Sequence, residues 1–219
     1  MFLSNSFVCF FIFNHINQLI KQLFPCLDQP SRQIILSTSH AIFTSIISTL
    51  YLHNLINDLI FYHLIFISFG FTLYDIKQIL VIRNRVWKQM LLHHCMIIGA
   101  LCPFVYYSFT NILPFALYPY YIAMNYLVEF ATIPLNISWY LHENNKQETI
   151  VFKIISITTI LLYLPFRVFN TAYLSFYSLM YLPHVMPLQE IQITFFIMNL
   201  YWFYRLCKKA QSLHNKKQN

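Results

Sequence analysis

Two adjacent histidines, His93 and His94, lie about one helical turn inside an apolar stretch of the sequence. An ionisable side chain is costly in hydrocarbon and usually faces the interior of a helix bundle or a polar cavity. Histidine can accept a proton from an attacking amine or hydroxyl near neutral pH, or can itself receive an acyl group. The pair therefore predicts the working site and favours acyl chemistry there. Adjacent residues on a helix point about 100° apart, so one imidazole can act while the other positions it, in either order.

Metal binding is the rival chemistry for a histidine pair, but the H-x-x-x-H and repeated H-x-x-H-H spacings that place ligands on one helical face are absent. The five cysteines are scattered without a C-x-x-C pair, which disfavours a disulfide framework and a zinc site. With only two glycines, Gly70 and Gly99, the chain contains no P-loop, G-x-G-x-x-G or G-x-S-x-G motif. We therefore expect no metal site, and nucleotide and serine-hydrolase chemistry are disfavoured.

The composition is that of a multi-pass membrane protein. Of 219 residues, 58% are apolar, 19% are aromatic and only 10% are charged, which excludes a disordered chain and argues against an ordinary soluble domain. The net charge of +7 is distributed over the connectors between apolar stretches, so membrane topology explains it better than nucleic-acid binding does. A single helical domain is expected to fill the chain.

Seven apolar stretches can cross a bilayer, which takes about 20 mostly apolar residues. Connectors with Lys or Arg alternate with connectors that have none, which predicts a cytosolic carboxyl terminus and an amino terminus on the opposite side. The first stretch lacks the basic region and the cleavage site of a signal peptide, so we expect it to insert as a span. The predicted spans are Phe7–Phe24, Gln33–Leu52, Leu59–Ile82, Met90–Phe109, Ile112–Leu141, Ile150–Tyr173 and Leu188–Leu206, and the connectors without basic residues are His53–Asp58, Thr110–Asn111 and Ser178–Pro187.

Ionisable residues from four predicted spans fall at similar depth when each is measured at about 1.5 Å per residue from the cytosolic end of its span. They are His40, Asp75, the histidine pair and Glu129. An unpaired carboxylate or imidazolium at this depth is costly unless a site compensates for it. We therefore expect a polar pocket in the cytosolic half of the membrane. For His40 and Asp75 the alternative is a buried side chain that hydrogen-bonds a neighbouring helix.

Prolines interrupt two of the predicted spans. The fifth carries Pro114, Pro119 and Pro134, and the sixth carries Pro165, so kinks or partial breaks are expected in both. Such breaks are tolerated in a bilayer where the freed backbone groups are buried in protein or line a cavity, which favours an internal chamber over a solid bundle. Arg167, in the outer half of the sixth span, could bind a lipid phosphate or carboxylate, pair with a helix carbonyl, or snorkel to the membrane surface.

Five short motifs over residues 31–209 resemble the TLC-domain family, the membrane fold shared by ceramide synthases and a set of lipid-homeostasis proteins. The motifs are Ser37-Thr38-Ser39-His40-Ala41, Tyr74-Asp75, Met90-Leu91-Leu92-His93-His94, Glu129-Phe130-Ala131-Thr132-Ile133-Pro134-Leu135-Asn136-Ile137-Ser138-Trp139 and Asn199-Leu200-Tyr201-Trp202-Phe203-Tyr204. Together they are similar to the non-synthase branch, the TLC domain-containing proteins. The resemblance implies an all-α multi-pass fold of six helices around a central lipid-accessible cavity. It also implies an N-terminal span and linker (residues 1–30), a TLC domain (31–209) and a basic cytosolic tail (210–219).

The resemblance also shows where this chain departs from ceramide synthases. In those enzymes the histidine pair is followed by a His-Asp dipeptide, a second Asp three residues later and then a Glu, which support N-acylation of a sphingoid base by acyl-CoA. Glu129 takes the place of that Glu after one inserted residue, and Tyr121-Ile122 and Asn125 stand where the acidic positions should be. Ceramide synthesis by the usual site is therefore not expected. The candidate substrate-binding residues are His40, Tyr121, Asn125 and Arg167.

The expected function is that of a non-enzymatic or weakly enzymatic protein that binds a lipid or acyl chain within its helix bundle and influences membrane lipid composition. Its partners would be membrane lipids and fatty acyl chains, without a cofactor. The alternative is a lipid acyltransferase with acyl-CoA as co-substrate, in which His93 or His94 is the base or acyl acceptor and Glu129 or Asp75 orients it. A transporter or channel is a third hypothesis, which the one-sided depth of the polar groups disfavours.

The last four residues, Lys216-Lys217-Gln218-Asn219, resemble a cytosolic dilysine retrieval signal. Such a signal holds multi-pass proteins in the endoplasmic reticulum membrane, and it fits the predicted cytosolic carboxyl terminus. The alternative interpretation is an ordinary basic tail attracted to anionic lipid.

Overall fold

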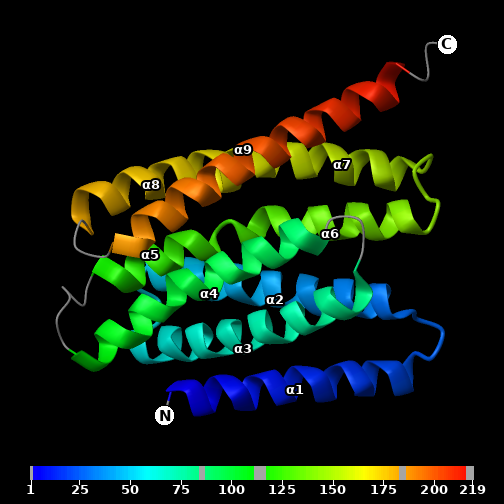
Figure 1. The fold of residues 1–219 in the computed structure, drawn as a ribbon. Coiled ribbons are helices and arrows are strands. Elements are labelled where there is room, and N and C mark those ends of the chain that lie inside the picture. The colour runs from blue at the N-terminus through cyan, green and yellow to red at the C-terminus, as the bar shows by residue number, and fades with distance from the viewer. Residues whose placement is uncertain (1, 84–86, 111–116, 183–185, 216–219) are drawn as a thin grey trace. The chain divides into compact units, whose positions relative to one another are not determined.

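A computed structural model describes residues 2–83, 87–110, 117–182 and 186–215, and these residues form helices and turns with no strand among them (Figure 1). The all-α class predicted from the sequence is therefore confirmed. Contacts divide the chain into two compact units, Met1–Leu127 (unit 1) and Val128–Asn219 (unit 2). Unit 1 contains α1 (Phe2–Leu23), α2 (Gln29–Leu52), α3 (Asp58–Ile82), α4 (Trp87–Thr110) and α5 (Leu117–Tyr126), and unit 2 contains α6 (Glu129–Glu143), α7 (Ile150–Tyr163), the π-helix η1 (Leu164–Phe169), α8 (Asn170–Tyr181) and α9 (Met186–Asn215).

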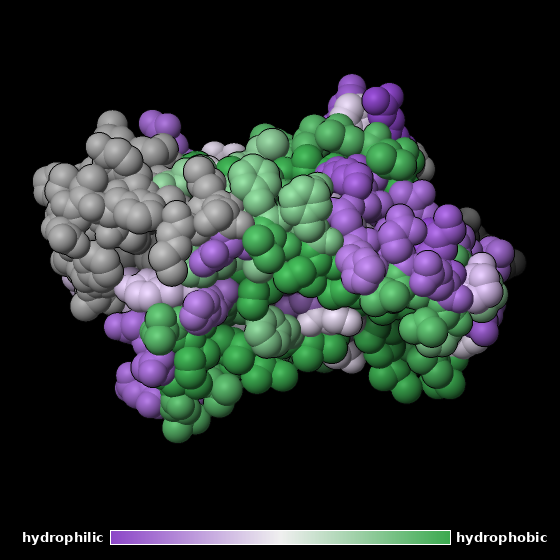
Figure 2. Space-filling view, turned by 90° about the horizontal axis from the view of Figure 1, so that it is seen from below, coloured by the Kyte–Doolittle hydropathy of each residue, from purple (hydrophilic) through white to green (hydrophobic). Residues whose placement is uncertain are grey.

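Three helical segments of the described chain are long and apolar enough to cross a membrane: α2, α3 and the run of α7, η1 and α8 from Ile150 to Tyr181. They correspond to the second, third and sixth predicted spans. Large apolar side chains are exposed on them, as Ile154, Ile157 and Leu161 are on α7, with more than half of each side chain accessible. Figure 2 likewise shows hydrophobic side chains spread over much of one face. These features are compatible with a membrane protein, whereas the seven-span arrangement stays a prediction.

The fifth and sixth predicted spans both depart from a regular α-helix. The fifth is divided between α5 and α6 by a turn at residues 127–128, and the described parts of the two helices have 10 and 15 residues. Pro134 stays inside α6, and Pro114 lies outside the described residues. Pro165 is accommodated by the π-helical turn, and the helix continues past the predicted end at Tyr173 as far as Tyr181.

Side-chain caps set the beginnings of α2 and α3 in unit 1. Asp28 accepts a hydrogen bond from the backbone N–H of Ser31 at 2.9 Å, and Pro30 occupies the first turn, where it needs no backbone partner. Asn57 accepts one from the N–H of Ile60 at 3.0 Å. Helix α2 therefore starts at Gln29, four residues before the predicted span, because the cap and not the apolar run decides where a helix begins.

Helix α1 packs on α3 through a close approach at Gly70. A Cβ atom built on Gly70 would lie 2.5 Å from the Cβ of Cys9 and 2.7 Å from the carbonyl oxygen of Ser6, so only glycine fits here. Aromatic and aliphatic side chains complete the contact: Phe10, Phe13, Ile16 and Ile20 of α1 pack against Leu36, Phe71 and Tyr74. Helix α1 is thus built into unit 1, while the division of the chain at residue 30 stays a prediction.

Unit 2 has its own apolar core. Buried Ala131, Tyr163 and Val168 are covered by partly buried side chains of η1 and of α9, among them Phe166 and Phe203. Helix α9 runs over 30 residues, beyond both ends of the last predicted span. This core holds η1 between α6 and α9, which positions Arg167 inside the unit.

Candidate functional site

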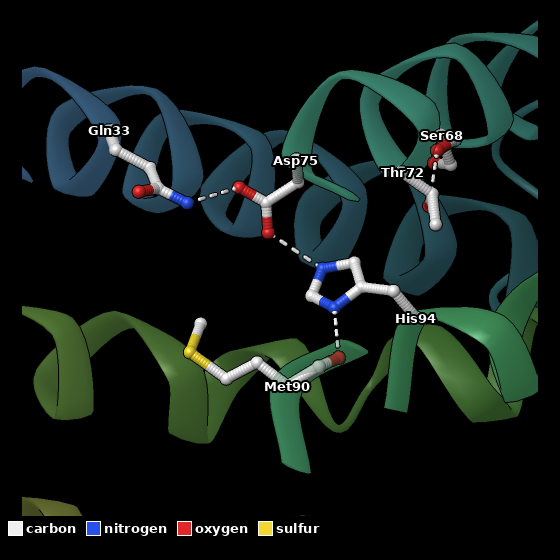
Figure 3. Close-up of polar contacts among 6 residues, drawn as sticks. All are labelled: Gln33, Ser68, Thr72, Asp75, Met90 and His94. Carbon is white, nitrogen blue, oxygen red and sulfur yellow. Dashed lines mark hydrogen bonds and ion pairs between the residues drawn. The ribbon is translucent and has the colours of Figure 1, made fainter. Parts of the chain in front are cut away.

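The side chains of Asp75 and His94 form a buried pair that joins α3 to α4. The Nε2 atom of His94 lies 2.6 Å from the Oδ2 atom of Asp75, and the two residues are 8% and 3% exposed. Figure 3 shows the carboxylate of Asp75 directed at the imidazole ring from the neighbouring helix. The sequence predicted both residues as catalytic candidates, and the structure brings them into direct contact.

The second ring nitrogen of His94 is engaged by its own helix. Its Nδ1 atom lies 2.7 Å from the carbonyl oxygen of Met90, one turn earlier (Figure 3). A carbonyl can only accept, so Nδ1 carries a proton and donates it. The Nε2 atom faces the carboxylate, and the two groups share the remaining proton, either as imidazolium and carboxylate or as a neutral pair. His94 therefore has no ring nitrogen left to take a proton from a substrate in this geometry.

The other oxygen of Asp75 is held by Gln33 of α2. The Nε2 atom of Gln33 donates to Oδ1 of Asp75 at 2.8 Å, as Figure 3 shows. The carboxylate thus accepts one hydrogen bond from an amide and meets an imidazole with its second oxygen, which is the compensation that a buried carboxylate requires. Three helices of unit 1 meet at Asp75.

Two further side-chain pairs lie along the same seam between α2 and α3. Gln29 donates to Oε1 of Gln78 at 3.0 Å, and Nε2 of His40 lies 3.2 Å from Oγ of Ser68. Residue numbers rise along α2 as they fall along α3, so the two helices are antiparallel. Figure 3 places Ser68 on the same helix as Asp75, two turns away. The seam is therefore a polar ladder between two helices that are each apolar enough to cross a membrane.

His40 belongs to this ladder and is also packed as an aromatic ring. Its ring stacks on Phe71 with centroids 4.0 Å apart and an interplanar angle of 11°. It interacts electrostatically with Asp75 and His94. The structure thus brings together His40, Asp75 and His94, three of the residues that the sequence predicted to converge. Their pairing also matches the alternative interpretation, in which His40 and Asp75 hydrogen-bond a neighbouring helix.

His93 occupies a different environment from His94. It is half-buried, and its ring meets that of His94 edge to face, with centroids 5.4 Å apart and an interplanar angle of 89°. The difference in burial follows from the helix, because adjacent residues point about 100° apart around its axis. Of the two histidines, His93 is therefore the better candidate for contact with a substrate, because the ring of His94 is closed by Asp75 and Met90.

The remaining predicted residues lie on α5 and in unit 2. Asn125 donates to the carbonyl oxygen of Tyr121 at 3.0 Å, and Tyr121 is buried. Their proposed role in substrate binding stays a prediction. Glu129 is the first residue of α6 and Arg167 lies in η1, both in unit 2, so their participation in the pocket stays a prediction as well.

Sequence reasoning missed Gln33, the Gln29–Gln78 pair and the carbonyl of Met90, because it searched for ionisable side chains only. A signal was present: Gln33 precedes His40 by seven residues, and Ser68 precedes Asp75 by seven, which is two helical turns. Polar residues at that spacing share one face of a helix. The carbonyl of Met90 had no signal, since every helical residue carries one.

Among the residues that the structure describes, no three His, Cys, Asp or Glu side chains are grouped as metal ligands would be. The site is therefore a hydrogen-bonded cluster of one carboxylate, two imidazoles, amides and a hydroxyl. In comparisons with family models, with curated proteins and with solved structures, the chain matches none.

Proposed function

We propose that this protein is a TLC-type integral membrane protein of lipid homeostasis, which binds a lipid or acyl chain within its helix bundle and influences membrane lipid composition. The proposal places it in the endoplasmic reticulum membrane with its carboxyl terminus in the cytosol. The observation that carries it is the closed contact of His94 with Asp75 and Met90, because that contact favours binding over chemistry.

A membrane setting is supported by the apolar surface of the described helices. Ile157 and Leu161 on α7 are 58% and 67% exposed, and similar side chains are exposed on α1, α2 and α3. A soluble monomer rarely exposes large contiguous apolar patches, whereas lipid tails would cover such side chains. A ligand that reaches the protein from such surroundings would be a lipid.

The polar ladder supports an amphipathic ligand. It supplies imidazole, amide and hydroxyl groups at Gln33, His40 and Ser68 between α2 and α3, both of which are apolar enough to cross a membrane. Ligand sites are typically apolar with a few polar groups that fix orientation. A lipid head group that hydrogen-bonds to this ladder would leave its acyl chain against the apolar side chains.

Binding rather than acyl transfer is supported by the state of His94. A general base must present a nitrogen within hydrogen-bond reach of the proton that it abstracts. Both nitrogens of His94 are engaged within unit 1, by Asp75 and by Met90. Asp75 and His94 therefore hold helices together, and the chemistry would fall to His93 if a reaction occurs at all.

The test of lipid binding uses the full chain purified from membranes in mild detergent. Extraction followed by mass spectrometry is expected to find a lipid class that is enriched over an unrelated membrane protein purified in the same way. A deletion strain is expected to show a changed level of at least one lipid class. Absence of both results would exclude the proposal.

One observation keeps acyl transfer as a second candidate: the ring of His93 lies against that of His94, which is itself paired with Asp75. Microsomes supplied with labelled acyl-CoA separate the two functions. Turnover that is lost in a His93→Ala variant, while the protein remains folded, supports transfer. The matched control is Lys88→Ala, an exposed position one and a half turns earlier on α4, which should leave turnover unchanged.

A further inference from the structure

Arg167 is buried in unit 2, although it lies in the middle of a segment apolar enough to cross a membrane. Only 3% of the residue is exposed. Its Nη2 atom donates to Oγ1 of Thr132 on α6 at 2.5 Å, and its Nη1 atom donates to Oδ1 of Asn199 on α9 at 3.4 Å. The guanidinium carbon lies 5.4 Å from the ring centroid of Tyr163. Neighbouring elements of the unit thus converge on one cation.

All of these partners are neutral. In the part of the chain that the structure describes, the ion pairs are His94–Asp75 and His142–Glu143, and neither involves Arg167. The Nε atom of Arg167 is buried and has no hydrogen-bond partner among the described residues. An arginine cannot lose its proton under these conditions, so its charge persists. Neutral oxygens satisfy hydrogen bonds, but they leave a full positive charge in apolar surroundings without a counterion from the residues that the structure describes.

An exposed arginine of the same unit, Arg205, shows how burial changes the way in which an arginine's charge is balanced. Arg205 on α9 also lies over a tyrosine four residues earlier, with its guanidinium carbon 5.8 Å from the ring centroid of Tyr201, and it donates to the hydroxyl of that residue at 2.9 Å. Arg205 is exposed, so solvent or lipid head groups can balance its charge. Arg167 has the same tyrosine arrangement without that access.

We propose that Arg167 is the anchoring cation of a binding site for an oxyanion, a phosphate or carboxylate such as the head group of an anionic lipid or a free fatty acid. A guanidinium binds either group through two parallel hydrogen bonds. Thr132 and Asn199 add a hydroxyl hydrogen and an amide NH₂, donors that an oxyanion accepts from. The π-helical turn that carries Arg167 is a geometry frequently found at functional sites.

This site is built from residues of unit 2 and the polar ladder from residues of unit 1, so the proposal stands even if lipid binding at the ladder fails. Its rival is an internal counterion. Glu129 lies one turn before Thr132 on α6 and is the nearest carboxylate in sequence to an Arg167 partner. Rotation of its side chain toward the guanidinium would neutralise the charge without any ligand. The experiment therefore includes a Glu129→Gln variant.

The test uses the full-length protein reconstituted in vesicles of phosphatidylcholine alone or with phosphatidic acid, and in detergent with inorganic phosphate or oleate. The readouts are the thermal unfolding midpoint and native mass spectrometry of bound ligand. We expect phosphatidic acid to raise the midpoint of the wild-type protein and of Arg205→Gln, the matched loss of one exposed charge. In Arg167→Gln we expect affinity to fall about tenfold or more, the factor that loss of a charge-assisted hydrogen bond produces.

Two gentler variants keep the test decisive if Arg167→Gln does not fold. Arg167→Lys retains the charge without the planar fork, and Thr132→Val leaves Arg167 in place, and both should weaken binding by a smaller factor. An Arg167-dependent shift with inorganic phosphate or oleate supports the site with a soluble source of the anion. Equal binding by wild type and all Arg167 variants overturns the proposal. So does a Glu129→Gln variant that loses stability as Arg167→Gln does, with no response to any anion.

Discussion

The Nε2 atom of His94 and the Oδ2 atom of Asp75 approach to 2.6 Å inside unit 1, and this contact ties α4 to α3. The side chains are 11% and 5% exposed, so water contributes little to their solvation. Each group therefore depends on the other, on Gln33 and on Met90 for its hydrogen bonds. Removing one partner of such a buried pair lowers stability strongly, because the other partner is left without compensation. Replacing both partners by apolar side chains costs less.

Substitution of one partner of this pair should destabilise the protein strongly. Asp75→Asn leaves His94 without its carboxylate, and His94→Gln leaves the carboxylate without its imidazole. If the pair is imidazolium and carboxylate, we expect each single variant to lose about 3–5 kcal/mol, the range for breaking a buried ion pair, and a smaller loss if the pair is neutral; in both cases the double variant should lose less than the sum. Thermal unfolding in detergent, arranged as a double-mutant cycle, measures the coupling between them.

The exposed His142–Glu143 pair in unit 2 provides the control. Its atoms lie 3.7 Å apart, with 38% and 57% of the side chains exposed. Glu143→Gln should therefore change stability by less than about 1 kcal/mol. Equal effects at the two pairs would show that burial does not govern the Asp75–His94 contact, contrary to what we infer.

The amide of Gln33 should contribute more than the amide of Gln29, although both span the same two helices. Gln33 donates to the carboxylate of Asp75 at 2.8 Å, whereas Gln29 donates to the neutral amide of Gln78 at 3.0 Å. Hydrogen bonds to charged groups contribute about 1.5–3 kcal/mol and neutral ones about 0.5–1.5. Gln33→Leu should therefore lower the unfolding midpoint more than Gln29→Leu does. A larger decrease for Gln29→Leu would contradict a ladder centred on the carboxylate of Asp75.

The fold was predictable where apolar runs end at polar residues and less so elsewhere. The predicted ends at Leu52 and Ile82 and the predicted start at Ile150 agree with α2, α3 and α7. The division between α5 and α6 was expected somewhere near the prolines, but it lies at residues 127–128, between Pro119 and Pro134. Its position has no local signal, because neither Leu127 nor Val128 is a residue that breaks a helix.

The site was predictable to the extent that charge is costly in an apolar segment. That argument placed Asp75 and His94 in the protein interior, where the structure buries them; for Arg167 it left snorkelling to the membrane surface open, and the structure buries this residue too. It left open whether Asp75 or Glu129 lies beside the histidine pair, and which of the two histidines it meets, because depth along a span does not determine which face of a helix a residue occupies. Gln33 was overlooked since a neutral amide costs less to bury, even though its seven-residue spacing from His40 placed it on the same face.

Replacement of Gly70 should release α1 from α3. Alanine normally favours a helix over glycine by about 1 kcal/mol, so an unconstrained site would be stabilised by Gly70→Ala. Here the new Cβ would lie 2.5 Å from Cβ of Cys9 and 2.7 Å from the carbonyl oxygen of Ser6, so we expect destabilisation instead. Maleimide labelling of Cys9 should become faster as α1 separates. A second change, Cys9→Gly, should restore stability only in part, because the Ser6 oxygen belongs to the backbone.

The stabilisation that the N-cap residue of α2 contributes to the fold should depend on pH, whereas that of the N-cap residue of α7 should not. Hydrogen bonds from the side chain and backbone N–H of Ser31, with the nearby charge of Arg32, lower the pKa of Asp28 below its ordinary value. A carboxylate with a lowered pKa stabilises the folded state fully above its unfolded pKa of about 3.9, and the contribution is lost as pH falls through the folded pKa. Thr149 caps α7 through a hydroxyl that accepts from the N–H of Phe152 at 3.2 Å and does not titrate.

Removal of either cap, by Asp28→Ala or Thr149→Ala, should cost about 0.5–2 kcal/mol at pH 7. As pH is lowered from 7 to 3, the difference between wild type and Asp28→Ala should shrink, whereas the difference between wild type and Thr149→Ala should stay constant. Asp28→Asn retains a capping oxygen without the charge, so it should remove the pH dependence and leave most of the stability. Thermal unfolding over this pH range measures all three variants. A constant difference for Asp28→Ala would show that its charge does not contribute to the cap.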